Sequence, residues 1–496
     1  MRIRRAATAA VLCAVGLTGL APAAATAEES RHSGSVSESA KLDPDSDTSG
    51  QMVWERFGSA GDIPADRIGE TFSAKRLDAA RAANAQPNTV TPQSSTSHPT
   101  AEREKHLARA LGQRYIADGS ETRSEQLGKF RSDAVGTTAN GIIEFDKCEA
   151  DPAGQAQDKN SPGHVIDHFN FCRWGYNQVT KLDGKGRIEG YVRFKEIEVG
   201  EGAKGTRTGR IHIKTKDVDG FGIYSEFSGT RMKIQPSLKG DINHLGECGN
   251  NNLVDFGGGK DSFTRELSGW EDQYIYYEIT SDETKADQSR VDKVSYCQFE
   301  THYKVLSAKG NTPWSYVSPT GGMRFDSATY MGSDIQYGHK GAIFNRVTPV
   351  FSYDRADASV ESVAEHIFDA LYAPQLTYPQ KNDKDIPGNI WNGEWQPLHR
   401  NVKTGTWGTF SPDSDAIAAA NERAKDSACA GLTRPADHDC DEFPFASTKE
   451  GAGVGDGNFS VRMVPATENR SAGGKLSAWY SKDRILDGDP YGIFVN

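Results

Sequence analysis

The feature that most constrains the fold is an alternation of apolar and polar residues that recurs from about residue 140 to 350. In the segment GRIHIKTKDV, Ile211 and Ile213 fall on one side, while His212 and Lys214 fall on the other. This two-residue period is the signature of a half-buried β-strand. Breaks rich in Gly and Asp separate several such segments, and this spacing predicts an antiparallel β-sandwich or barrel.

The C-terminal part combines helical and strand patterns over short distances. Val360, Val363, Ile367 and Leu371 form one apolar stripe, which predicts a helix over 358–373. Further patterns predict a second helix, two strands and, between those strands, a turn that leads into a short helix. These segments are 413–431, 459–466, 491–496 and 467–483, respectively.

The N-terminal part reads as a targeting segment followed by a polar stretch. Arginines precede an apolar, Ala-rich run that ends in small residues, so we expect a secretory signal over 1–27, cleaved before Glu28. The run is too short and too interrupted to anchor the mature chain in a membrane, so we expect a secreted, extracellular protein. Residues 28–130 are rich in Ser, Ala, Asp, Thr and Pro, which predicts a disordered or helical pro-segment or linker. Within it, helices are favoured around 65–83 and 100–117.

Seven cysteines are present, and the first leaves with the signal. An even number in an exported chain indicates disulfides. Of the fifteen connectivities that six cysteines allow, proximity favours one bond per local segment: Cys148–Cys172, Cys248–Cys297 and Cys429–Cys440. A zinc site formed by Cys429, His438 and Cys440 is the alternative, although zinc-ligand spacings are usually tighter and more regular.

The formal net charge of -11 argues against a protein that coats nucleic acid through a broad basic surface. The charge does not exclude an enzyme that engages nucleic acid locally, through a metal ion and a few arginines.

The stretch CDEFPFAS at 440–447 places two adjacent acids, Asp441 and Glu442, before two aromatic residues. Neighbouring acids by themselves indicate a solvated turn. Here they are followed by Glu450-Gly451, by a predicted strand, and then by Asn469-Arg470.

These residue types suit hydrolysis of a phosphodiester, which needs neutralisation of charge and an in-line water. Mg²⁺ or Mn²⁺ takes oxygen ligands and can contact both the phosphate and the leaving oxygen. Glu442 beside Phe443 and Phe445 fits a general base, because apolar surroundings raise a carboxyl pKa toward the working pH. Asn469 offers a neutral carbonyl ligand to the metal, and Arg470 suits bidentate contact with phosphate.

Four neighbouring residues are secondary candidates. Asp441 serves the metal or the fold, and it is also the next candidate for the base together with Asp439. Glu450 is a candidate metal ligand, or a surface acid that supports one. His438 is more often a loop residue than a base, although it lies close enough in sequence to replace one.

The order of these motifs resembles the secreted bacterial deoxyribonucleases of the NucA/NucB type. That family's pattern runs Asp-Arg-Asp-Glu-aromatic-Pro, then Glu-Gly-Gly, then Asn-Arg-Gly-Ala-Gly; the matching elements here are 439–444, 450–451 and 469–473. The resemblance covers about 60 residues closely and 378–496 more weakly. One departure is Cys440, which stands where the pattern has arginine. If that arginine binds phosphate, the positive charge must here come from elsewhere.

The resemblance implies a small one-metal nuclease domain with a ββα-metal core at 370–496, behind a β-rich accessory domain at 140–350. The expected fold class is therefore α+β. The expected function is a secreted metal-dependent endonuclease that acts mainly on DNA, with one Mg²⁺ or Mn²⁺ per site. The alternative is a secreted binding or wall-associated β protein whose nuclease-like tail is inactive.

Overall fold

The computed structural model describes residues 51–85, 113–117, 145–156, 161–225, 229–240, 248–249, 253–254, 263–288, 290–306, 316–318, 320–331, 339–390, 395–403 and 412–496. Lys41–Asn496 form one compact unit. The signal segment predicted over 1–27 lies outside the described residues. Within the described ranges, no helix is long and apolar enough to cross a membrane.

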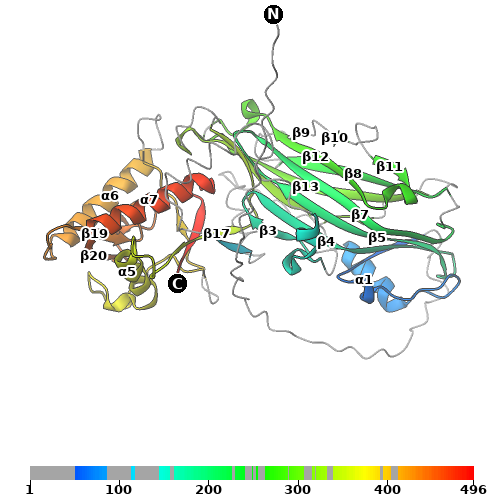
Figure 1. The fold of residues 1–496 in the computed structure, drawn as a ribbon, viewed down its shortest axis with the longest axis horizontal. Helices are drawn as coiled ribbons and strands as arrows, with labels where there is room; N and C mark the ends of the chain where they lie inside the picture. The colour runs from blue at the N-terminus through cyan, green and yellow to red at the C-terminus, as the bar shows by residue number, and fades with distance from the viewer. Residues whose placement is uncertain are drawn as a thin grey trace, which may run out of the picture. The chain divides into compact units, whose positions relative to one another are not determined.

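Two antiparallel sheets occupy the region in which the alternating pattern predicts strands (Figure 1). The first sheet has the order β1 (Met52–Phe57), β4 (Asn170–Leu182), β5 (Ile188–Glu201), β7 (Thr208–Gly222), β12 (Gln273–Ser281) and β10 (Leu253–Val254), with β3 (His164–Asp167) on β4 and β9 (Cys248–Gly249) on β12. The second has the order β11 (Phe263–Glu266), β8 (Arg231–Gly240), β13 (Ser295–Leu306), β15 (Gly321–Ser327), β16 (Lys340–Phe344) and β6 (Ala203–Lys204), with β14 (Tyr316–Val317) on β13.

The two sheets share one hydrophobic core, which is the arrangement of a sandwich. Ile211 and Ile213 of the first sheet belong to the same buried cluster as Phe299 of the second. His212 points to the opposite face of its strand, where its ring stacks on Tyr274 with centroids 5.7 Å apart. The alternation read from the sequence therefore separates the core face from the outer face correctly.

The structure differs from the disordered or helical segment predicted over 28–130. Residues 52–57 form β1, which extends the first sheet by pairing with β4. A helix does follow, but α1 spans Ala74–Ala85 rather than 65–83. Leu77 of α1 is buried in a cluster with Tyr191 of β5. This part of the segment is ordered because its few large apolar side chains are buried against the sandwich.

A separate four-stranded sheet supports the C-terminal part. β17 (Thr348–Tyr353) lies parallel to both β21 (Pro490–Val495) and β2 (Arg114–Ala117), and β18 (Leu398–His399) pairs with β21. β2 differs from the helix predicted over 100–117, because these four residues add an edge strand to β17. The rest of that predicted helix, up to residue 112, lies outside the described residues.

Three helices and one hairpin complete the C-terminal part (Figure 1). They are α5 (Glu361–Tyr372), α6 (Pro412–Cys429), α7 (Ala466–Lys482) and the antiparallel pair of β19 (His438–Phe443) and β20 (Ser460–Pro465). α5, α6, β20 and β21 confirm the predicted segments. Side chains of β17 and α5 share a core with β19 and α7, so this unit begins before the predicted boundary at 370.

α7 corrects the prediction of a turn and a short helix over 467–483. The structure has one continuous helix that contains the adjacent Gly473 and Gly474. These glycines favour a break, but Ala472, Leu476 and Trp479 are buried on one face of the helix. The packing of that face outweighs the low helix propensity of glycine.

Charged side chains join the segment after α7 to the sandwich. Arg484 forms an ion pair with Asp326 of β15, and both side chains are buried. Arg324 pairs with Asp489 and donates to the carbonyl of Arg484 at 2.6 Å. These contacts lie within the compact unit formed by Lys41–Asn496.

Candidate active site

The predicted acid pair lies on β19, the first strand of the hairpin that α7 follows directly. Successive side chains on a strand point to opposite faces. Asp441 shares its face with Phe443, which is fully buried in the C-terminal core, and Glu442 shares the other face with Cys440. Asp441 and Glu442 are only 7% and 8% exposed. The pair is therefore a buried part of a strand and not a solvated turn.

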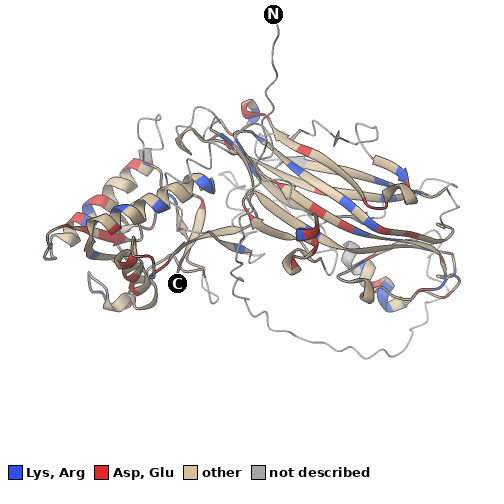
Figure 2. Ribbon diagram, viewed as in Figure 1, with Lys and Arg blue, Asp and Glu red and all other residues tan. Residues whose placement is uncertain are grey.

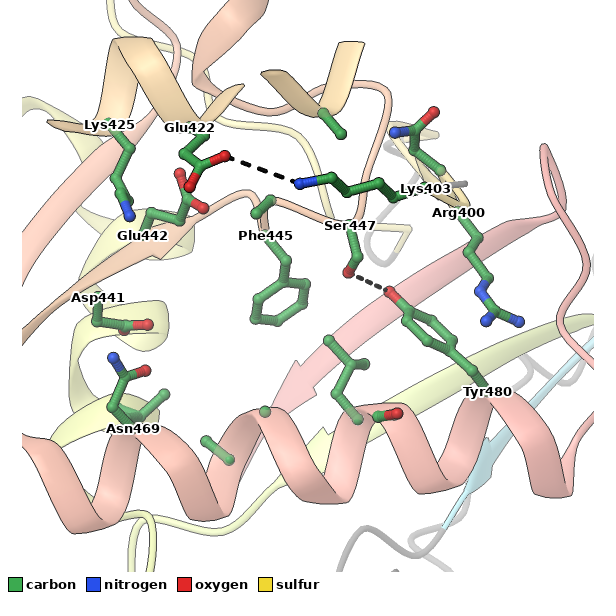
Figure 3. Close-up of a pocket in the computed structure, with 18 of the residues that line it drawn as sticks. Arg400, Lys403, Glu422, Lys425, Asp441, Glu442, Phe445, Ser447, Asn469 and Tyr480 are labelled. Carbon is green, nitrogen blue, oxygen red and sulfur yellow. Dashed lines mark hydrogen bonds and ion pairs between the residues drawn. The ribbon is translucent and has the colours of Figure 1, made fainter. Parts of the chain in front are cut away.

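A cleft of about 660 Å³ opens beside this strand (Figure 3). Glu422 and Lys425 of α6 line it on one side, and Asn469 and Tyr480 of α7 line it on the other. The other lining residues are Tyr353, Val363, Arg400, Asn401, Val402, Lys403, Ala418, Cys440, Asp441, Glu442, Phe445, Ala446, Ser447, Ala472, Gly473, Leu476 and Ser477.

Glu442 is an incompletely paired acid in this cleft. Its Oε2 atom is buried and has no hydrogen-bond partner among the described residues. Burial raises the pKa of the Glu442 carboxyl to about 8, and the negative charge of Asp441 acts in the same direction. The positive charge of Lys425 acts against this shift. A carboxyl group with this pKa holds its proton at neutral pH and loses it as the pH rises through about 8.

Asp441 is held by a neighbour from α5. Its Oδ2 atom lies 2.7 Å from Nδ1 of His366, whose Nε2 lies 2.7 Å from Oγ of Ser460 on β20. Figure 3 shows the side chain of Asn469 pointing from α7 toward the carboxylate of Asp441. The structure therefore brings together Asp441, Glu442 and Asn469, three of the residues predicted for the site.

Two other predicted residues, Asp439 of β19 and Arg470 of α7, form an ion pair with each other. Asp439 pairs with Arg434 at 2.7 Å and with Arg470 at 3.5 Å. The side chain of Arg470 is 75% exposed. Asp439 lines an adjoining cleft of about 580 Å³, which shares Lys425 and Asn469 with the first cleft.

Glu450 lies apart from the acid pair and binds a histidine. Its carboxylate accepts hydrogen bonds from Nδ1 of His399 at 2.6 Å and from the backbone N–H of His399 at 2.7 Å. Glu450 is not among the described residues that line either cleft. His438, the substitute base in the sequence interpretation, has its Nδ1 2.8 Å from the carbonyl of Ala436.

The donor set of the cleft fits a hard cation that keeps part of its water shell. Among the described residues, no group of three or more His, Cys, Asp and Glu side chains could hold a metal ion. The cleft offers two carboxylates and the amide of Asn469, including the unpaired Oε2 of Glu442. Mg²⁺ is typically bound by one or two carboxylates together with waters and substrate phosphates. The residues present therefore fit a partly hydrated Mg²⁺ or Mn²⁺ ion better than an ion that is held by protein ligands alone.

Two of the predicted disulfides are confirmed. Cys148 is bonded to Cys172, and Cys429 is bonded to Cys440. The second bond joins the end of α6 to β19 and excludes the zinc alternative at these positions. Cys297 is also disulfide-bonded, but the side chain of Cys248 lies outside the described residues.

Three residues of the site were not predicted from the sequence. Lys425 lines both clefts and lies near Glu442, so it brings positive charge to the position where Cys440 replaces the arginine of the family pattern. His366 and Ser460 reach Asp441 from α5 and β20. The position of His366 gave one signal, because it lies three residues after Val363 on the buried side of the predicted helix.

Basic and acidic residues are mixed along the described elements (Figure 2). Figure 2 shows Lys and Arg interspersed with Asp and Glu along the strands of the sandwich and along the C-terminal helices. This mixture agrees with the net charge of -11.

Two strands and the helix that follows them hold a buried acid pair and an amide beside one cleft, and these groups suit the hydrolysis of an anionic substrate. Residues 399–494 match the family described as Deoxyribonuclease NucA/NucB. The C-terminal part of the chain is therefore a deoxyribonuclease domain of the NucA/NucB type, as its motifs predicted. No curated protein and no solved structure matches the chain.

Proposed function

We propose that the chain is a secreted, metal-dependent endonuclease that hydrolyses phosphodiester bonds of DNA. The observation that carries this proposal is the buried carboxyl of Glu442, with Oε2 unpaired among the described residues. It faces a cleft shared with Asp441 and Asn469, inside the segment that matches the deoxyribonuclease family.

In this proposal β19, β20 and α7 form the ββα-metal unit. Asp441 from the first strand and Asn469 from the helix would hold one Mg²⁺ or Mn²⁺. The ion supplies Lewis-acid stabilisation of the phosphate and of the leaving oxygen. The neutral amide of Asn469 contributes a ligand without adding negative charge that would repel the substrate.

Glu442 is the proposed general base. In its ionised form it takes a proton from the attacking water, and burial raises its pKa to about 8, so this carboxylate is a stronger base than an exposed glutamate. Lys425 lies close enough to Glu442 to lower the pKa of that carboxyl, and it would also attract the anionic backbone of the substrate. Arg470 is exposed and pairs with Asp439, which lines the adjoining cleft, and it is the proposed contact for a phosphate outside the cleavage site.

Secretion belongs to the same proposal. Two disulfides are typical of an oxidising compartment, and the first 27 residues have the pattern of a secretory signal.

The test is degradation of plasmid DNA by the purified full-length chain. We expect cleavage in Mg²⁺ or Mn²⁺, loss of cleavage in EDTA, and recovery when the divalent metal is restored. Nicked and linear plasmid should appear before short fragments, because an endonuclease cuts within the strand. A folded chain that leaves the plasmid intact in both metals would refute the proposal and favour a binding protein with an inactive nuclease-like tail.

A further inference from the structure

His366 lies at the centre of a buried polar chain that crosses three elements. It is on α5, while its partners are Asp441 on β19 and Ser460 on β20. His366 and Ser460 are completely buried, and Asp441 is 7% exposed. Both ring nitrogens have a partner at 2.7 Å, so the imidazole is fixed at both ends.

The buried residues next to His366 on α5 are apolar. Val363, Ile367 and Ala370 of the same helix are buried in the C-terminal core. A buried polar ring in such a place is costly unless its hydrogen bonds are made. An apolar side chain of similar volume would fill the space without that requirement. Packing alone therefore does not account for the hydrogen-bonded chain of Asp441, His366 and Ser460.

The hydrogen bond to Asp441 provides that explanation. An ionised carboxylate only accepts hydrogen bonds. The proton of the imidazole is therefore on Nδ1 of His366, and this N–H group donates a hydrogen bond to Oδ2 of Asp441. This bond ties one oxygen of Asp441 to the core and fixes the rotation of the carboxylate. The other oxygen, Oδ1, remains for the cleft, toward which Asn469 points (Figure 3).

We propose that His366 is a positioning residue for DNA cleavage, acting through Asp441. This inference rests on the proposed function and adds a residue that lies before the matched segment 399–494. Hydrogen-bond partners of metal-binding side chains typically contribute 10- to 100-fold to metal affinity or activity. The functional unit of the nuclease then includes α5.

Two nearly isosteric variants of the full-length chain separate positioning from packing. In His366→Asn the amide N–H replaces Nδ1–H and keeps the donor to Asp441. In His366→Gln the amide lies near the position of Nε2, so the contact with Ser460 is kept and the donor to Asp441 is lost. We expect the Asn variant to stay within a few-fold of the wild-type rate and the Gln variant to fall about 10- to 100-fold. Mn²⁺ affinity, measured by electron paramagnetic resonance, should weaken in the Gln variant alone.

A double-mutant test shows whether the effect passes through Asp441. His366→Gln should change neither Mn²⁺ affinity nor cleavage further when Asp441→Asn is already present. The matched control is His212, a buried histidine of the sandwich; His212→Asn and His212→Gln should leave both quantities unchanged.

Equal losses in the Asn and Gln variants, in proportion to their fall in Tm, would assign His366 to packing and overturn the inference. A Gln variant with wild-type rate and Mn²⁺ affinity would overturn it as well. Should both variants fail to fold, NMR of the wild-type chain decides: added Mg²⁺ should shift the Nδ1–H resonance of His366, which reports on Asp441, and an unchanged resonance would overturn the inference. A wild-type chain that does not cleave DNA refutes the proposed function instead, and the Mn²⁺ measurements still test the role of His366.

Discussion

Asp441 and Glu442 are adjacent in sequence but meet different parts of the C-terminal unit. Asp441 is directed to α5 and is tied by His366. Glu442 is directed toward α6, where Lys425 affects its pKa. The two-residue period of the strand therefore gives one acid a fixed orientation and leaves the other buried with Oε2 unpaired among the described residues. Two carboxylates with different environments can take different roles in one reaction.

Another buried acid, Asp483, lies directly after α7 and is not among the described residues that line the cleft. It accepts hydrogen bonds from the indole N–H of Trp479 and from the hydroxyl of Tyr115. Burial raises the pKa of the Asp483 carboxyl from 3.8 to about 6, although the bond from Trp479 acts in the opposite direction. The folded state therefore binds this proton more tightly than the unfolded state does.

This shift predicts how stability depends on pH. The contribution of Asp483 is fully present below about pH 4 and is lost as the pH rises through about 6. Asp483→Asn cannot titrate, so the wild type should lose on the order of 3 kcal/mol relative to this variant between about pH 4 and pH 7. Denaturant unfolding of both proteins across that range measures the difference. Stability curves that run parallel would contradict the raised pKa.

Sequence reasoning reached the site residues that are close together in the chain. Asp441 and Glu442 form one motif, and Asn469 follows at the start of the next helix. It missed His366, which contacts Asp441 across 75 residues of sequence, because tertiary packing alone brings α5 to the hairpin. Nor could the sequence indicate the contact of Glu450, a candidate metal ligand, with His399, because it forms only where β18 approaches the loop after β19.

At the scale of elements, the periodic spacing of apolar residues predicted helices and strands better than the positions of residues that break them did. The apolar stripe of α5 and the alternation in β7 matched the observed elements. A turn leading into a short helix was predicted over 467–483, where α7 is one continuous helix, because sequence propensity takes no account of the face buried by Leu476 and Trp479. β1 and β2 were missed because each is a short strand that is stabilised by its sheet neighbours.

The disulfide between Cys429 and Cys440 is predicted to matter for activity as well as stability. It joins the end of α6, which carries Lys425, to the strand that carries both acids. Replacing both cysteines by alanine should cost roughly 3 kcal/mol in the chain-entropy model. It should also slow DNA cleavage, because α6 is then less firmly held against the cleft. Thermal unfolding and plasmid cleavage of the double variant measure the two effects.

The bond between Cys148 and Cys172 provides the matched control, since it is buried in the sandwich region. Its removal should lower stability by a similar amount and leave the cleavage rate of the folded protein unchanged. A folded Cys429→Ala, Cys440→Ala variant that cleaves DNA at the wild-type rate would show that this disulfide has a structural role only.

At the scale of the whole molecule, the chain combines a large antiparallel sandwich with a nuclease domain. The sandwich contacts the segment after α7 through the buried pair of Arg484 and Asp326. The same segment reaches the cleft wall, because Asp487 accepts a hydrogen bond from the backbone N–H of Val402 at 2.9 Å. The described structure thus connects the sandwich to residues that line the cleft, and functional tests belong on the full-length chain.

In the proposed mechanism Glu442 activates water while Asp441 and Asn469 hold the metal. The most direct test measures the plasmid cleavage rate of the full-length chain against Mn²⁺ concentration for wild type, Glu442→Gln and Asn469→Ala. Glu442→Gln should bind Mn²⁺ normally and lose about 10²- to 10⁴-fold in rate at every concentration, because its amide cannot take the proton. Asn469→Ala should bind Mn²⁺ more weakly and recover part of its rate as the concentration rises. A folded Glu442→Gln variant that cleaves DNA near the wild-type rate would contradict the account.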